Sequence, residues 1–197
     1  MGKIKKEYYL NEDVVKVAKD LIGKHLFTRV NNRITAGLIV ETEAYHSKEK
    51  ACHAYMNKRT ARTETLFSRG GIAYVYKCYG IHHLFNIVTN VEDKAEAVLI
   101  RAVQPVEGLD VTLKRRKLKK IQPSMTAGPG VLTQALGITK KHNGLCLTDD
   151  LIWLEDHQLA YLPQQIIAGP RVGVDYAGKD AKLPWRFRLK DCPWCSK

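Results

Sequence analysis

Apolar and polar residues alternate in short runs along most of the chain, which is the pattern typical of half-buried β-strands. It predicts strands over residues 25–30, 36–45, 72–76, 83–89 and 96–103. Helical spacing near the N-terminus places five apolar residues on one face: Val14, Val17, Ala18, Leu21 and Ile22. We expect Asn11 to cap this helix, with Glu12 and Asp13 in its first turn, and Gly23 to end it.

Short turns, and not crossover helices, join the adjacent predicted strands. Residues 105–120 are expected to be helical in part, and a Gly/Pro-rich loop precedes a short helix over 131–137. The chain contains no repeat and no flexible linker. These features predict an α+β fold with an antiparallel or mixed sheet, in one domain over residues 1–197.

Charge narrows the choice of partner. The 197 residues carry 32 Lys and Arg against 20 Asp and Glu, a formal net charge of +12, which favours nucleic acid or an anionic membrane surface. No apolar run approaches the roughly 18 residues that span a bilayer. The first ten residues lack the apolar segment of a signal peptide, and the five cysteines fit a reducing compartment. We therefore expect an intracellular protein without a membrane partner.

Two carboxylates end an otherwise apolar strand. Because side chains alternate along a strand, Glu41, Glu43 and Tyr45 should share one face. Such a pair is either solvated at the end of the sheet or placed there for acid–base chemistry.

The predicted hairpin carries a second unusual feature. Tyr79 stands at its tip, where Asn, Asp or Gly is more common. A projecting aromatic can pack on a neighbouring loop or act as a wedge between stacked bases. Asn86 shares a strand face with Leu84 and Val88, so its amide needs a partner or a function.

Residues 113–120, LKRRKLKK, hold six cations in eight positions. They form either a solvated helix face or a set of phosphate contacts, and a nuclear-localisation segment is a weaker alternative. Lys114, Arg115 and Arg116 are the candidates for DNA contact.

Cysteine and histidine spacing does not predict a metal site. Cys192 and Cys195 form a single CxxC without a second ligand pair, and they lie far from the strand-to-helix position of a redox motif. His46, Cys52 and His53 lack a fourth ligand. We expect neither metal nor cofactor.

Taken together, nine blocks in register resemble the alkyladenine (3-methyladenine) DNA glycosylase family. They are LIGK from Leu21, GLIVETEAY from Gly37, His53, RT-ART from Arg59, YVYKCYGIHHLFNI from Tyr74, VLIRAVQPVEG from Val98, AGPGVLTQALGI from Ala127, GPRVGVDYAG from Gly169 and PWRFRLKDCPW from Pro184.

The resemblance implies a single compact α+β domain around a curved, mainly antiparallel sheet with a protruding β-hairpin. It also implies a role for individual residues. Glu43 would be the general base, and Arg101 and the backbone carbonyl of Val172 would hold the attacking water. A flipped base would lie among Tyr45, His53 and Tyr76, with His46 competing for the histidine's place. Tyr79 would be the wedge, and Asn86 would inspect the exocyclic position of the purine.

The activity implied is that of a monofunctional glycosylase that flips alkylated purines out of duplex DNA and hydrolyses their N-glycosidic bond. Its substrates would be 3-methyladenine and 7-methylguanine, with hypoxanthine and ethenoadenine as further candidates. It would act as a monomer in the bacterial cytoplasm or nucleoid, or in a eukaryotic nucleus. The main alternative is a non-catalytic nucleic-acid-binding domain with the same charge and hairpin. An RNA-binding module like the C-terminal domain of formyltransferases is a weaker one, because it leaves Glu43 and Tyr79 without a purpose.

Overall fold

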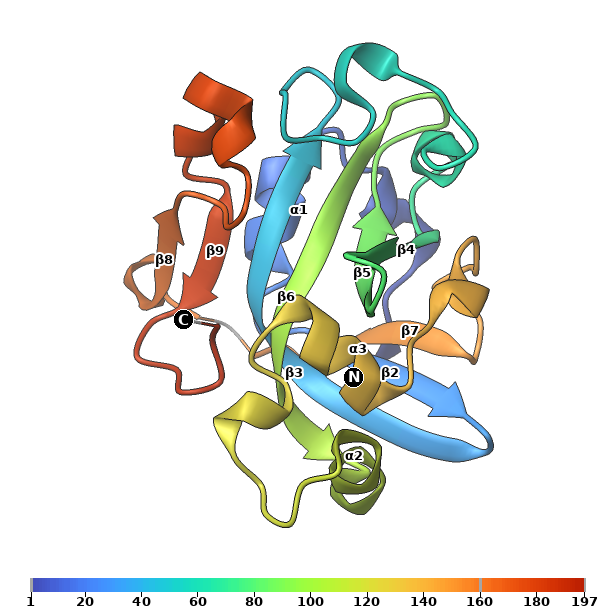
Figure 1. Cartoon of the computed structure of the whole chain (residues 1–197), viewed down its shortest axis with the longest axis vertical. Helices are drawn as coiled ribbons and strands as arrows, with labels where there is room; N and C mark the ends of the chain where they lie inside the picture. Colours follow the sequence, from blue (N-terminus) through green and yellow to red (C-terminus); the bar gives the residue numbers. More distant parts are fainter. Residues whose placement is uncertain (1, 160, 197) are drawn as a thin grey trace.

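Nine strands form one open antiparallel sheet in the computed structural model, which describes residues 2–159 and 161–196 (Figure 1). The strands are β1 (Gly2–Lys3), β2 (His25–Val30), β3 (Arg33–His46), β4 (Ala73–Cys78), β5 (His82–Val88), β6 (Glu96–Glu107), β7 (Ile152–Asp156), β8 (Ile166–Gly169) and β9 (Arg186–Leu189). Their order is β1-β7-β2-β3-β6-β5-β4, and β9 joins β3 to β8. The α+β prediction and the antiparallel sheet are confirmed.

Strand β3 organises the sheet. One of its edges pairs first with β2 and then, over residues 41–43, with β9, while the other edge pairs with β6. The register with β6 shifts between Ile39 and Thr42, and such irregularities bend a strand and redirect its side chains. The two glutamates of this strand therefore lie where three strands meet.

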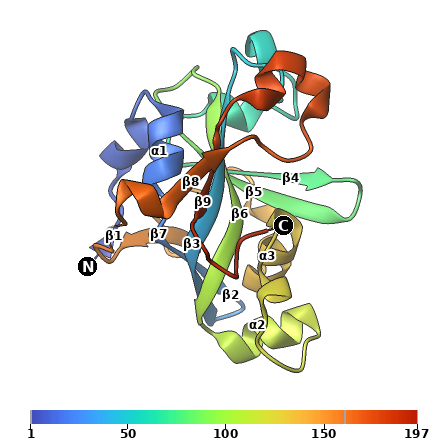
Figure 2. The same ribbon diagram turned by 90° about the vertical axis from the view of Figure 1, so that its left-hand side faces the viewer.

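The β4–β5 hairpin extends away from the body of the molecule (Figure 2). Its turn spans residues 79–81, with Tyr79 and Gly80 both left-handed at φ 48° and 72°, and the Ile81 N–H donates to the Cys78 carbonyl over 3.2 Å. A left-handed tyrosine is uncommon, since its Cβ crowds the backbone. The expectation of a protruding hairpin with an aromatic tip is confirmed.

Three α-helices flank the sheet: α1 (Val14–Asp20), α2 (Leu109–Arg116) and α3 (Pro129–Leu136). Short 3-10 helices cover residues 6–10, 55–57, 64–67, 123–125, 140–142, 163–165 and 175–182. In Figure 2, α1 lies on one side of strands β3 and β6, and α2 and α3 lie on the other. No helix in residues 2–159 and 161–196 is long and apolar enough to span a bilayer.

The predicted cap of the first helix is wrong by two residues. The Asp13 carboxylate accepts from the N–H groups of Val15 and Lys16 at 3.0 and 2.9 Å, and so satisfies two free donors of the first turn. Asn11 instead accepts from the N–H of Asp13 at 2.9 Å. Asn11 thus forms an Asx turn that leads into the cap. Asn and Asp side chains form both Asx turns and N-caps, so the sequence alone does not distinguish the two.

Candidate active site

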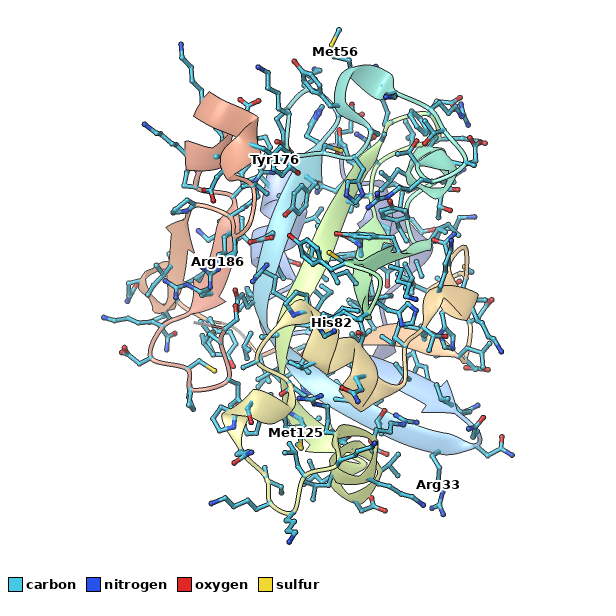
Figure 3. All side chains as sticks on the ribbon, viewed as in Figure 1. Arg33, Met56, His82, Met125, Tyr176 and Arg186 are labelled. Carbon is cyan, nitrogen blue, oxygen red and sulfur yellow. The ribbon has the colours of Figure 1, made fainter. Side chains whose placement is uncertain are left out.

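A cavity of about 700 Å³ opens beside the hairpin. Its walls come from β3 to β6, from the loop before α3 and from the segment around residues 172–176. Figure 3 labels two lining residues, with Tyr176 above and His82 below. Segments far apart in the sequence therefore build one pocket, and its volume lies in the range usual for small-molecule ligand sites.

Glu43 is completely buried and does not itself line the cavity, but it is bonded to residues that do. Its Oε1 accepts from the backbone N–H of Val172 over 2.8 Å. Its Oε2 accepts from the Tyr45 hydroxyl over 2.8 Å and from Arg101 Nη1 over 3.3 Å. Tyr45, Arg101 and Val172 all line the cavity, so the carboxylate is fixed by three groups that face the pocket.

The structure confirms that Glu41, Glu43 and Tyr45 share a face, because Arg101 contacts both carboxylates and Tyr45 contacts the second. Thr42 points the other way and donates to the Ala18 carbonyl in α1. The solvated alternative for the two glutamates is wrong, since neither carboxylate has any exposed surface.

Aromatic rings form one wall of the cavity. His53 packs edge-on against Tyr76, with ring centres 4.6 Å apart, and its Nδ1 lies 3.0 Å from the Tyr74 hydroxyl. Burial, with a contribution from nearby Arg62, lowers the pKa of His53 to about 4. The ring is therefore neutral at physiological pH.

Arg62 fixes the tautomer of this histidine. Its Nη2 can only donate, so the His53 Nε2 at 3.3 Å is the acceptor and Nδ1 carries the proton toward Tyr74. The same guanidinium lies over the Tyr76 ring, 5.3 Å from its centre. Neither Arg62 nor Tyr74 was assigned a role from the sequence, although alternation within YVY places Tyr74 on the face of Tyr76.

His46, the other candidate for the pocket histidine, lies elsewhere. Its Nδ1 accepts from the Lys48 N–H and its Nε2 lies 3.1 Å from Glu96, and it is absent from the cavity wall. The structure thus places His53, and not His46, among the pocket aromatics.

Asn86 is buried in β5 and faces the cavity, as its position between Leu84 and Val88 predicts. Its side-chain N–H donates to the Tyr74 carbonyl over 3.1 Å. This bond anchors the amide next to the aromatic wall. The prediction that the buried amide has a partner is therefore confirmed.

The hairpin tip overhangs the mouth of the cavity. Tyr79 is 89% exposed and still lines the cavity, and the adjacent Ile81 is 72% exposed. A large aromatic held in a tight turn with no covering loop is suited to contact with another molecule. The alternative that Tyr79 packs on a neighbouring loop is wrong.

Two of the three candidate DNA-binding residues on helix α2 form hydrogen bonds within the protein. Arg115 donates to Thr35 Oγ1 and to the Ala135 carbonyl, and Arg116 donates to the Met125 and Ser124 carbonyls. Lys114 is exposed, as are the lysines at 117, 119 and 120. Of the three predicted DNA contacts, Lys114 alone points into solvent, while Arg115 and Arg116 tie α2 to the segment around α3.

A buried ion pair behind Tyr45 escaped the sequence analysis. Arg171 bonds both oxygens of Glu49 at 2.7 and 2.8 Å, donates to the Ala44 carbonyl and lies over the Tyr45 ring at 4.7 Å. Since Val172 follows directly, this pair fixes the segment whose N–H binds Glu43. In the sequence, only the GPRVG block, which contains Arg171 and Val172, indicated that this segment matters.

Cys192 and Cys195 pack, with Trp194, against Leu38, Val40 and Ala102. Both thiols are free, and the Cys195 Sγ donates to the Val40 carbonyl over 3.4 Å. Burial raises the pKa of Cys195 to about 12, so this thiol is a packing group.

Comparison with known proteins agrees with this geometry. Residues 8–193 match the family model of methylpurine-DNA glycosylase. The chain is 44% identical to a protein of Chlamydia felis, over 92% of this chain and 93% of that one. It is 40% identical to one of Clostridium novyi over both full lengths, and 44% identical to one of Carboxydothermus hydrogenoformans over 94% of each. All three relatives are provisionally named 3-methyladenine DNA glycosylases.

The α+β fold and the buried carboxylate beside an open cavity describe an enzyme-like site, and the family match makes the protein a DNA glycosylase. The chain belongs to the methylpurine-DNA glycosylase family.

Proposed function

We propose that this glycosylase rotates alkylated purines out of duplex DNA and hydrolyses their N-glycosidic bond without a lyase step. The observation that carries the proposal is the buried Glu43 carboxylate, held by three residues that line a cavity of about 700 Å³. A base stacked within a duplex is not accessible to an enzyme's catalytic groups, so the nucleotide must leave the stack to enter the cavity.

Glu43 is the general base in this proposal. Glycosidic cleavage gives the sugar oxocarbenium character, which a nearby carboxylate stabilises, and the same carboxylate takes a proton from the attacking water. Arg101 and the Val172 carbonyl hold that water. The Val172 N–H and the Tyr45 hydroxyl keep Glu43 in one orientation, so little reorganisation accompanies the reaction.

The pocket selects purines that carry positive charge. A 3-methyladenine or 7-methylguanine nucleotide has a cationic ring, which stacks favourably on Tyr45, His53 and Tyr76 and departs readily from the sugar. Hypoxanthine and ethenoadenine are neutral, so they depart less readily from the sugar. Asn86, at the rear of the aromatic wall, inspects the exocyclic position.

Tyr79 fills the gap left by the extruded nucleotide. Its exposure at the end of a projecting ribbon lets it enter the minor groove while the cavity receives the base. Lys114 and the other exposed lysines of residues 113–120 contact phosphates without reading sequence. One copy of the chain contains all of these parts, and we propose that it acts as a monomer.

The experiment is a release assay on duplexes that each carry one defined lesion. The proposal requires free 3-methyladenine and an intact abasic strand, with no covalent adduct trapped by borohydride. Glu43→Gln should lose this activity. Release that continues unchanged in Glu43→Gln would show that another group is the base, and a trapped adduct would show lyase chemistry.

A further inference from the structure

Glu41 is a completely buried carboxylate to which the proposed reaction assigns no role. Its Oε1 accepts from Arg101 Nε at 2.9 Å, from Arg186 Nε at 2.7 Å and from the Ser196 hydroxyl at 2.8 Å. Its Oε2 accepts from the Ser196 backbone N–H at 2.6 Å. Burying a charge so completely is costly, so four donors at one carboxylate indicate a specific purpose.

Arg101 is the link between this carboxylate and the cavity. Glu41 holds its Nε, Ser196 Oγ accepts from its Nη2 at 3.3 Å, and only Nη1 reaches Glu43. The bond to Glu41 is 0.4 Å shorter than the bond to Glu43, from 2.9 and 3.3 Å. The orientation of the Arg101 guanidinium is thus set mainly by Glu41 and Ser196, and less by Glu43.

Charge provides a second link. Glu41 and Glu43 face Arg101 and Arg186, so two carboxylates balance two guanidiniums within the cluster. The Cys195 thiol, protonated through burial, adds no charge beside Glu41. On its other sides Glu43 meets the neutral Tyr45 hydroxyl and the Val172 N–H, while Arg171 behind Tyr45 is paired with Glu49.

We propose that Glu41 is a positioning residue of the glycosylase, an inference that rests on the proposed function. It aims Arg101 at the water site, and its charge offsets those of Arg101 and Arg186 beside Glu43. Arg186, on β9 beside β3 and labelled in Figure 3, and Ser196 are the other two residues that donate to the Glu41 carboxylate.

Three variants separate these two effects. Glu41→Gln removes the charge and weakens the bond to Arg101. Glu41→Gln with Arg186→Met restores the charge balance but leaves Arg101 poorly held. Glu96→Gln is the control for putting an amide in place of a buried carboxyl group, because Glu96 lies on β6, contacts His46 and is not bonded to Arg101.

The experiment measures single-turnover base release from a 3-methyladenine duplex between pH 5 and 8, together with the Kd for that duplex. Weakening a hydrogen bond to a charged group predicts a roughly ten- to hundredfold slower release in Glu41→Gln, with little change in Kd. The acid limb of its rate profile should move to lower pH, because uncompensated cations beside Glu43 favour the ionised base. In the double variant the limb should return toward its wild-type position while the rate stays low.

Glu96→Gln should keep the wild-type rate and profile. The inference is overturned if Glu41→Gln also keeps them, or if both variants lose only stability. Should Glu41→Gln not fold, two other variants carry the test: the charge-balanced double variant, and Ser196→Ala, which removes the hydroxyl bonded to Glu41, Arg101 and Arg186 without changing charge. Both variants must slow release while the acid limb of the rate profile stays where it is in the wild type. Failure of the wild type to release the base would instead overturn the proposed function.

Discussion

The Tyr45 hydroxyl donates a 2.8 Å hydrogen bond to Glu43, two residues before it on the same strand. Burial first, and the adjacent carboxylate second, raise the pKa of Tyr45 well above its usual value, so the phenol keeps its proton and remains a donor. In the proposed reaction, one strand therefore supplies both the Tyr45 ring on which the base stacks and the carboxylate that takes a proton from the attacking water. The alternation of strand side chains produces this coupling.

Tyr45→Phe should distinguish the stacking of the Tyr45 ring on the base from the positioning of Glu43 by the Tyr45 hydroxyl. The ring remains, so affinity for the lesion duplex should hold, whereas single-turnover release should slow about tenfold through loss of a charge-assisted hydrogen bond. Tyr176→Phe is the control, because that hydroxyl also belongs to a cavity residue but donates to the Ala51 carbonyl. Equal effects of the two variants would refute a special role for the Tyr45–Glu43 bond.

Tyr79→Ala should weaken binding to lesions in fully paired duplex by about tenfold, since filling a vacated stacking position is worth a few kcal/mol at most. Excision from a single strand or beside a mismatch should change much less. Tyr79→Phe should restore duplex binding. The wedge role is excluded if Tyr79→Ala loses activity equally on paired and unpaired substrates.

Variants of helix α2 should distinguish a residue that contacts phosphate from one that stabilises the fold. Lys114→Ala should reduce the salt dependence of DNA binding by about one in the logarithmic slope, and leave stability unchanged. Arg115→Ala removes bonds to Thr35 and Ala135, so it should lower the free energy of unfolding by about 1–2 kcal/mol. Salt titrations and urea melts measure the two effects, and the opposite pattern would show that Arg115 is the phosphate contact.

Glu96 should make stability depend on pH. Burial raises its pKa from 4.5 to about 7, and the native state therefore binds its proton more tightly than the unfolded chain does. Stability should fall as pH rises from 4.5 to 7 and then level off. Glu96→Gln removes this loss, so the variant should gain about 1 kcal/mol relative to wild type between pH 4.5 and 7 in urea melts. A constant difference across that range would contradict the raised pKa.

Local patterns predicted the parts of the fold that depend on near neighbours. Alternation placed Glu41, Glu43 and Tyr45 on one face, and the Tyr-Gly pair indicated the hairpin tip. The burial of the two glutamates was not predictable, because the donors that stabilise it are distant in sequence: the guanidinium groups of Arg101 and Arg186 and the backbone N–H of Ser196.

Long-range partners explain the remaining differences. The charge run of α2 gave no sign that Arg115 and Arg116 would find carbonyl oxygens in the segment around α3. Likewise, the Glu49–Arg171 pair joins residues 122 positions apart. A single sequence shows which residues are charged, but only the fold shows which charges remain free for a ligand.

The central claim is that Glu43 performs the chemistry while other groups hold the DNA. Its most direct test is single-turnover release of 3-methyladenine by Glu43→Gln, measured beside the Kd for the same duplex. The account predicts a fall in rate of at least about a thousandfold at an unchanged or tighter Kd, as for removal of an essential base. A rate within a few-fold of wild type would contradict it.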